Sequence, residues 1–108
     1  MIRAFVMGLA LTVGVAAIAS AQDKAKGEKV FTDQKCSLCH SIGGHGNAKG
    51  SLDGVGSKLS ADEIRQWVTD AKTMTAKTKA TRKPEMKQYT LPKADVDAIV
   101  AYLSSLKK

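Results

Sequence analysis

The strongest pattern of hydrophobic and polar positions lies toward the C-terminal end of the chain. Pro92 can occupy the first turn of a helix there, and Asp95 suits the positive end of that helix's dipole. Apolar residues spaced three and four apart then form one stripe, made by Val96, Ile99, Val100, Leu103 and Leu106. Because such a stripe covers one face of a helix, the sequence predicts an amphipathic helix in this region.

A second helix is predicted in the middle of the chain. Ser60 and Glu63 have the spacing of a capping box, in which a serine cap is followed three residues later by a glutamate. Apolar residues then share one helical face, namely Ile64, Trp67 and Val68. The sequence therefore predicts a helix over about 61–70.

A short helix and a long loop are predicted in the part of the chain that precedes this helix. Val30 and Phe31 are apolar among lysines, which favours a short helix over 24–31. Residues 41–57 contain six glycines, so we expect a loop with little regular structure. A loop this long needs something to wrap around.

The segment 72–87 is strongly basic. It carries six lysines and arginines against Glu85 alone. Pro84 hinders a helix from running through the segment, so the sequence predicts a solvated loop rather than core. No segment alternates apolar and polar residues with β-branched enrichment, and therefore no sheet is predicted. The expected fold class is all-α.

The N-terminal residues have the pattern of a secretory signal peptide. A basic start at 1–3 precedes an apolar run over 4–18, and Ala19-Ser20-Ala21 has the small-x-small pattern that signal peptidases recognise. An uncleaved membrane anchor would need about 20 apolar residues, which is more than this run supplies. We expect cleavage of residues 1–21, export to the periplasm, no stable membrane insertion afterwards, and a mature domain over 22–108.

Size and charge narrow the possible functions. The chain of 108 residues has a net charge of +7, which falls to +6 when Arg3 leaves with the signal peptide. Such a charge permits nucleic acid, anionic membranes or acidic proteins as partners, and export argues against nucleic acid. A domain this small needs additional stabilisation. Because Cys36 and Cys39 would close only a very short disulfide loop, a buried cofactor is the better candidate.

The two cysteines belong to Cys36-Ser37-Leu38-Cys39-His40, which fits the haem-attachment motif C-x-x-C-H. Two thiols about one turn apart can form thioethers with the same porphyrin, while the adjacent histidine binds the iron. A structural zinc site is an alternative, in which His45 would be the fourth ligand. A dithiol redox pair is another alternative, although it requires a βαβ context that this sequence lacks.

Around this motif the chain resembles class I cytochromes c over nearly all of residues 24–108. The motif lies near the mature N-terminus, and a glycine-rich loop ending at 52–56 follows it. A middle helix containing Trp67 and a Pro-x-Met sequence before the final helix then occur in the family's order. The resemblance implies a small helical fold whose first and last helices cross beside one covalently attached haem c.

The resemblance also implies particular contacts between helices. Gly27 would permit the close approach of the first and last helices. Phe31 would pack against the last helix near Tyr102 or Leu103. These contacts overlap with an ordinary core role for the same aromatic residues.

Further residues are expected around the haem. Lys58 and Trp67 match positions from which relatives hydrogen-bond the haem propionates, although Trp67 can equally be a core residue. Many relatives carry a proline after the loop glycine, where this chain has Gly50-Ser51. The sequence therefore leaves open whether the carbonyl contact that orients His40 is present.

The second axial ligand decides between electron transfer and ligand chemistry. After signal cleavage the chain retains two methionines, Met74 and Met86. Met86 lies in Pro84-Glu85-Met86, where the resemblance places the methionine ligand opposite His40. Met74 is the alternative, and Lys79 could bind iron only if deprotonated. His45 is expected to be a polar loop residue.

The predicted function is that of a monomeric periplasmic one-electron carrier without substrate chemistry of its own. We expect acidic redox proteins to dock on the basic segment 72–87, which would border the Met86 side of the haem. Two alternatives remain open. One is a haem subunit of a larger oxidoreductase, and the other is a five-coordinate haem protein that binds gases or acts on peroxide.

Overall fold

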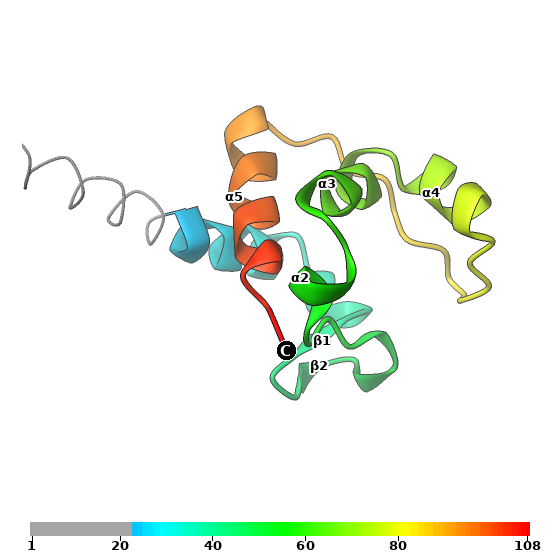
Figure 1. The fold of residues 1–108 in the computed structure, drawn as a ribbon, viewed down its shortest axis with the longest axis horizontal. Helices are drawn as coiled ribbons and strands as arrows, with labels where there is room; N and C mark the ends of the chain where they lie inside the picture. Colours follow the sequence, from blue (N-terminus) through cyan, green and yellow to red (C-terminus); the bar gives the residue numbers. More distant parts are fainter. Residues whose placement is uncertain (1–22) are drawn as a thin grey trace, which may run out of the picture.

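The computed structural model describes residues 23–108, and the predicted signal peptide lies outside them. A helix described over residues 23–33 is called here the N-terminal helix. It is followed by α2 (Val55–Lys58), α3 (Ala61–Thr69), α4 (Ala71–Thr78) and α5 (Lys93–Ser104). Helices dominate this part of the chain (Figure 1), which confirms the predicted fold class. None of the helices within residues 23–108 combines the length and apolar character needed to cross a membrane.

The N-terminal helix packs directly against α5. A Cβ atom at Gly27 would overlap the carbonyl oxygen of Ala98, so only glycine allows the two backbones to approach this closely. The rings of Phe31 and Tyr102 meet edge to face, with centroids 6.3 Å apart. The predicted contacts of the first and last helices through Gly27 and Phe31 are therefore confirmed.

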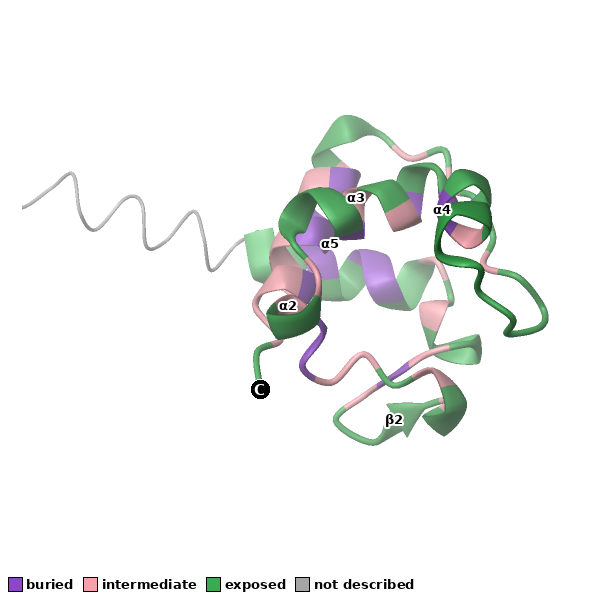
Figure 2. Ribbon diagram, turned by 45° about the vertical axis from the view of Figure 1, so that its right-hand side comes forward, coloured by how far each residue is buried: buried purple, intermediate pink, exposed green. Residues whose placement is uncertain are grey.

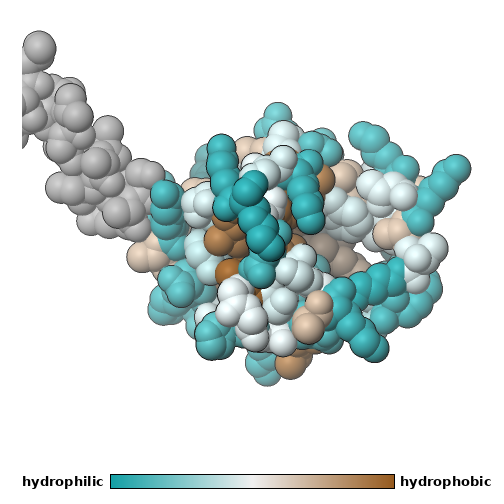
Figure 3. Space-filling model, turned by 60° about the horizontal axis from the view of Figure 1, so that its bottom comes forward, coloured by the Kyte–Doolittle hydropathy of each residue, from teal (hydrophilic) through white to brown (hydrophobic). Residues whose placement is uncertain are grey.

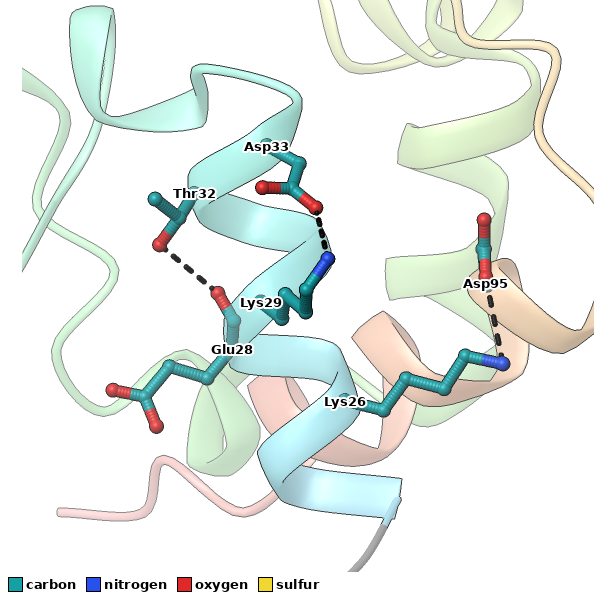
Figure 4. A network of polar contacts seen from close by, with 6 residues as sticks. All are labelled: Lys26, Glu28, Lys29, Thr32, Asp33 and Asp95. Carbon is teal, nitrogen blue, oxygen red and sulfur yellow. Dashed lines mark hydrogen bonds and ion pairs between the residues drawn. The ribbon is translucent and has the colours of Figure 1, made fainter.

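Ion pairs lie at the edge of this contact between the two helices, and not at its centre. Lys26 Nζ reaches Asp95 Oδ1 on α5 at 3.5 Å, whereas Lys29 pairs with Asp33 at 2.9 Å inside its own helix (Figure 4). Such exposed pairs contribute little to stability, because solvent screens them. The apolar contacts hold the two helices together.

The core lies where α3, α5 and the N-terminal helix face one another (Figure 2). Its buried members are Val30, Phe31, Val55, Ile64, Val68, Val96, Ile99, Val100 and Leu103. Burial of each large apolar side chain contributes roughly 1.5–3 kcal/mol relative to exposure. The stripe predicted for the last helix is thus confirmed at four positions, while Leu106 lies beyond α5 and is only partly buried.

The middle helix begins at the predicted capping box. Ser60 Oγ accepts a hydrogen bond from the Glu63 amide at 3.1 Å, and Glu63 Oε1 accepts one from the Ser60 amide at 3.0 Å. Such a cap contributes about 1 kcal/mol to helix stability. The helix ends at Thr69, one residue before the predicted boundary.

The prediction of a loop throughout 72–87 is wrong for its first half. Residues Ala71–Thr78 form α4, and Ala71 and Met74 on it are 0% and 5% exposed. Only two apolar side chains anchor this helix, so the sequence shows no periodic stripe there. The helix ends at Lys79, which has left-handed backbone (φ 55°), and the rest of the segment is an irregular loop as predicted.

The glycine-rich loop also contains a small sheet that the sequence analysis did not predict. Strands β1 (Ser41–Ile42) and β2 (His45–Gly46) pair in antiparallel fashion, with Ile42 opposite His45. Gly43 and Gly44 connect them with φ values of 59° and 83°, which glycine adopts without strain. Strands of two residues are too short to give a recognisable alternation.

Candidate cofactor site

The C-x-x-C-H motif folds into a tight turn shortly after the N-terminal helix. Lys35 has left-handed backbone (φ 57°) and precedes the 3-10 turn η1 (Cys36–Leu38). The amide groups of Cys39 and His40 both donate to the carbonyl oxygen of Cys36, at 3.1 and 2.9 Å. Cys36 is half-buried, Cys39 is exposed, and both thiols are free. The turn therefore presents two thiols and one imidazole within a single compact segment.

His40 is held in a defined orientation by one backbone oxygen. Its Nδ1 lies 2.9 Å from the carbonyl oxygen of Gly50, which can only accept, so Nδ1 carries the proton. The other nitrogen, Nε2, is then free to bind a metal. Burial lowers the pKa of His40 and the nearby Arg82 charge lowers it further, while the Gly50 contact opposes the shift. The contact between His40 and the Gly50 carbonyl oxygen, which the sequence left open, is present. It forms although this chain has Ser51 where many relatives have a proline.

The glycine-rich loop wraps closely around the backbone of the motif. A Cβ atom at Gly46 would overlap the carbonyl oxygen of His40, and one at Gly50 would overlap that of Cys39. The amide of Asn47 also donates to the His40 carbonyl oxygen at 3.1 Å. The glycines thus give the loop its close approach to the motif turn.

A cavity of about 580 Å³ opens beside this turn. The three motif residues Cys36, Cys39 and His40 line it together with Met86 and Trp67. A second, smaller recess shares part of this lining and is bordered by core residues, among them Phe31, Leu52, Val68, Ile99 and Leu103. Five of the six predicted site residues are therefore gathered around one largely apolar cavity.

The remaining candidates lie elsewhere. Lys58 is exposed at the end of α2 and does not line the cavity, so its contact with a haem propionate stays a prediction. Met74 is buried on α4 and is also absent from the lining, which favours Met86 as the methionine near the motif. His45 is exposed on β2, as expected of a polar loop residue.

The lining also contains residues that the sequence did not single out, and three of them are polar residues close to the methionine segment. Thr75 comes from α4, and Arg82 and Tyr89 come from the segments on either side of Met86. Burial raises the pKa of Tyr89, and burial also raises that of the Cys36 thiol beside it. Tyr89 could have been noticed as the single aromatic residue between Trp67 and the last helix. Thr75 and Arg82 carried no signal because they lie in the segment predicted to be a solvated loop.

The geometry does not support the two alternatives to haem. Within residues 23–108, no group of three or more His, Cys, Asp or Glu side chains is arranged to hold a metal ion. A zinc site built from the motif and His45 is therefore not formed. The described part of the chain also contains only a two-stranded antiparallel sheet, which lacks the βαβ context of a thioredoxin-like dithiol.

The cavity fits a haem attached to the motif. Its volume lies in the range of small-molecule sites, roughly 300–1,000 Å³, and its lining is mostly apolar. Two thiols stand at its edge for thioether bonds, and the fixed imidazole of His40 leaves Nε2 for the iron. Fold and site together define a haem-binding electron-transfer protein.

Comparison with known families agrees with this class. The sequence model of the family described as Cytochrome c matches residues 24–107, so the chain belongs to the cytochrome c family. Membership implies covalently attached haem c with its iron, and members of the family are usually electron carriers. Searches of curated proteins and of solved structures each found no match.

Proposed function

We propose that this protein is an exported, diffusible one-electron carrier and does not catalyse a reaction on a substrate. One observation carries the proposal, namely that Met86 lines the same cavity as His40. Cys36 and Cys39 would attach a haem, and the His40 imidazole and the Met86 thioether would be available to bind its iron. An iron bound by both residues would be closed to oxygen and peroxide.

The residues around the cavity suit electron transfer. Haem iron supplies one-electron redox chemistry, and a methionine ligand raises its potential relative to a second histidine because soft sulfur favours the ferrous state. The neutral His40 imidazole stays oriented by Gly50, so little rearrangement accompanies a change of charge. Apolar neighbours such as Val68 and Leu103 keep water away from the site.

Ligation by Met86 can be tested with carbon monoxide and with two methionine variants. The reduced wild-type protein is expected to bind carbon monoxide slowly or not at all, whereas Met86→Ala binds it promptly. The matched control is Met74→Leu, which conserves side-chain volume and is expected to behave like wild type. Prompt binding by the wild-type protein would instead support the five-coordinate gas-binding or peroxidatic alternative.

The basic segment is proposed as the docking surface for acidic redox partners. Exposed cations of α4 and the following loop lie along one edge of the molecule, and Arg82 and Lys87 among them also line the cavity. On the face drawn in Figure 3, hydrophilic side chains cover most of the surface and project from the right-hand edge, where α4 lies in Figure 1. Such a charged edge beside the haem would steer an acidic partner during encounter.

Docking can be tested by reduction kinetics with a candidate acidic donor. The second-order rate constant is expected to fall as ionic strength rises, because salt screens the attraction. The double variant Lys72→Gln/Lys79→Gln should be slower than wild type at low ionic strength and nearly equal at high ionic strength. A rate independent of salt would contradict steering, and a fixed-ratio complex on purification would instead indicate a subunit of a larger oxidoreductase.

Export is proposed from the sequence pattern of residues 1–21, which lie outside the described part of the chain. Cleavage before Gln22 would deliver the cysteines to the periplasm, where thioether formation takes place in bacteria. N-terminal sequencing of the protein from its native host is expected to begin at Gln22. A sequence that begins at Met1 would contradict cleavage.

A further inference from the structure

Arg82 connects the two segments that supply the iron ligands. It precedes Met86 by four residues in the irregular loop after α4. Its guanidinium lies so close to Gly50 that a Cβ atom at Gly50 would overlap it. Gly50 is also the residue whose carbonyl oxygen holds His40 Nδ1 at 2.9 Å. One side chain therefore extends from the Met86 loop to the loop that orients His40.

The charge of Arg82 has no acidic partner among the ion pairs of residues 23–108. The acidic residue nearest in sequence, Glu85, is engaged by Lys83 at 2.8 Å. Arg82 nevertheless lines the cofactor cavity and is also exposed to solvent. A guanidinium in this position can bind an anionic group of the molecule that occupies the cavity.

Haem brings two carboxylates, its propionates, into this cavity. A carboxylate partly removed from water needs a charged or strongly hydrogen-bonding partner. The lining contains two other cations, Lys35 and Lys87, and Lys87 already lies 5.5 Å from the centre of the Tyr89 ring. A guanidinium can also form two parallel hydrogen bonds with a carboxylate, which an ammonium group cannot do.

We infer that Arg82 binds a haem propionate and thereby ties the Met86 loop to the His40 loop. Position 50 requires glycine, because the Arg82 guanidinium and the Cys39 carbonyl oxygen occupy the space that a side chain would need. Arg82 is thus a cofactor-binding and positioning residue that the sequence pattern concealed within a basic segment. The inference depends on haem attachment and is independent of the carrier role.

The test uses the purified holoprotein and three variants. Arg82→Gln removes the charge and the paired donors, and Arg82→Lys keeps the charge alone. Lys49→Gln is the matched control, because it removes one positive charge from an exposed position next to Gly50 that does not line the cavity. The readouts are the midpoint potential and the resonance Raman bending mode of the haem propionates, which reports their hydrogen bonding.

Arg82→Gln is expected to favour the ferric form, because a propionate charge near the iron is no longer balanced. We expect at least a threefold change in the one-electron equilibrium, which corresponds to about 28 mV at 59 mV per tenfold change. The propionate mode should shift in Arg82→Gln and Arg82→Lys but not in Lys49→Gln. The inference is overturned if Arg82→Gln leaves the mode unchanged, or changes the potential no more than Lys49→Gln does.

Discussion

The two sides of the cavity differ in how the polypeptide holds them. On the histidine side, the motif turn is fixed by backbone hydrogen bonds to Cys36, by the Gly50 carbonyl on His40 and by a loop that touches the motif backbone. On the methionine side, the chain from residue 81 to residue 88 donates no backbone hydrogen bond within the described structure. Backbone hydrogen bonds therefore hold the His40 side, whereas the Met86 segment donates none of its own.

This difference suggests a division of roles. A preformed histidine site suits permanent attachment of a cofactor, because the two cysteines and His40 already lie in a folded turn. A loop that donates no backbone hydrogen bonds opens at low free-energy cost. We therefore expect the methionine–iron bond, and the contact of Arg82, to supply much of the order of the segment around Met86.

The largest expected effect concerns α4, the helix that leads into the Met86 loop. Met74 is 5% exposed on α4, so Met74→Ala should lower the free energy of unfolding by about 3 kcal/mol through lost burial and a cavity. Met74→Leu, as control, should cost less than about 1.5 kcal/mol. Urea unfolding followed by circular dichroism measures both. Equal stability of Met74→Ala and wild type would show that α4 contributes little to the fold.

A smaller effect is expected from damage to the histidine side. In Gly50→Ala, the new Cβ atom would overlap the Cys39 carbonyl oxygen, and we expect a loss of about 2 kcal/mol because backbone must shift. Gly43→Asn is the control, since nothing lies within 4 Å of that position and asparagine tolerates its left-handed backbone. The same urea experiment applies, and a control that loses as much as Gly50→Ala would contradict the tight fit.

The difference between the histidine and methionine sides of the cavity can be tested without a mutation. In the ferric holoprotein, the weak near-infrared band of a methionine–iron bond should disappear at lower urea than the helical circular dichroism signal. The reason is that the Met86 loop can open while the helical core remains folded. If the two signals disappear together, the methionine side is as firmly held as the rest of the domain.

The smallest expected effect lies far from the cavity, on the contact of α3 with α5. Asp97 accepts from Arg65 at 2.8 Å and from Lys93 at 2.8 Å, and these hydrogen bonds hold its pKa below the usual value. A lowered folded-state pKa gives stability that is present above the unfolded pKa and is lost as pH falls through the folded pKa. Asp97→Asn should therefore be slightly less stable than wild type at neutral pH.

The pH dependence provides the check on that small effect. The stability difference between Asp97→Asn and wild type should shrink as acid protonates Asp97. Thermal unfolding at neutral and acidic pH measures it for both proteins. A difference that stays constant with pH would mean that the carboxylate charge does not contribute.

Much of the helical frame could be predicted because its signals are local. The apolar stripe of α5 and the Ser60–Glu63 capping box each follow from spacing alone, and both are confirmed. The contact of Gly27 with α5 followed from family resemblance rather than from pattern. The helix α4 was missed because two buried side chains, Ala71 and Met74, are too few to create a periodic signal.

The site was predictable to the extent that its chemistry is contiguous in sequence. Cys36, Cys39 and His40 lie together in a recognisable motif, and Met86 lines the same cavity as these three residues. The role of Gly50 could not be derived, because it depends on how a distant loop meets the imidazole. The position of Arg82 was hidden for the same reason, since a charge in a basic segment gives no sign of what it contacts.

The most direct test of the account is the mass of the protein purified from its native host, followed by the mass of its proteolytic peptides. The account predicts a chain that begins at Gln22 and carries the added mass of one haem. That added mass should be found on the peptide that contains Cys36, Cys39 and His40. A purified polypeptide without the added mass of haem would contradict covalent attachment, and with it the proposed roles of Met86 and Arg82.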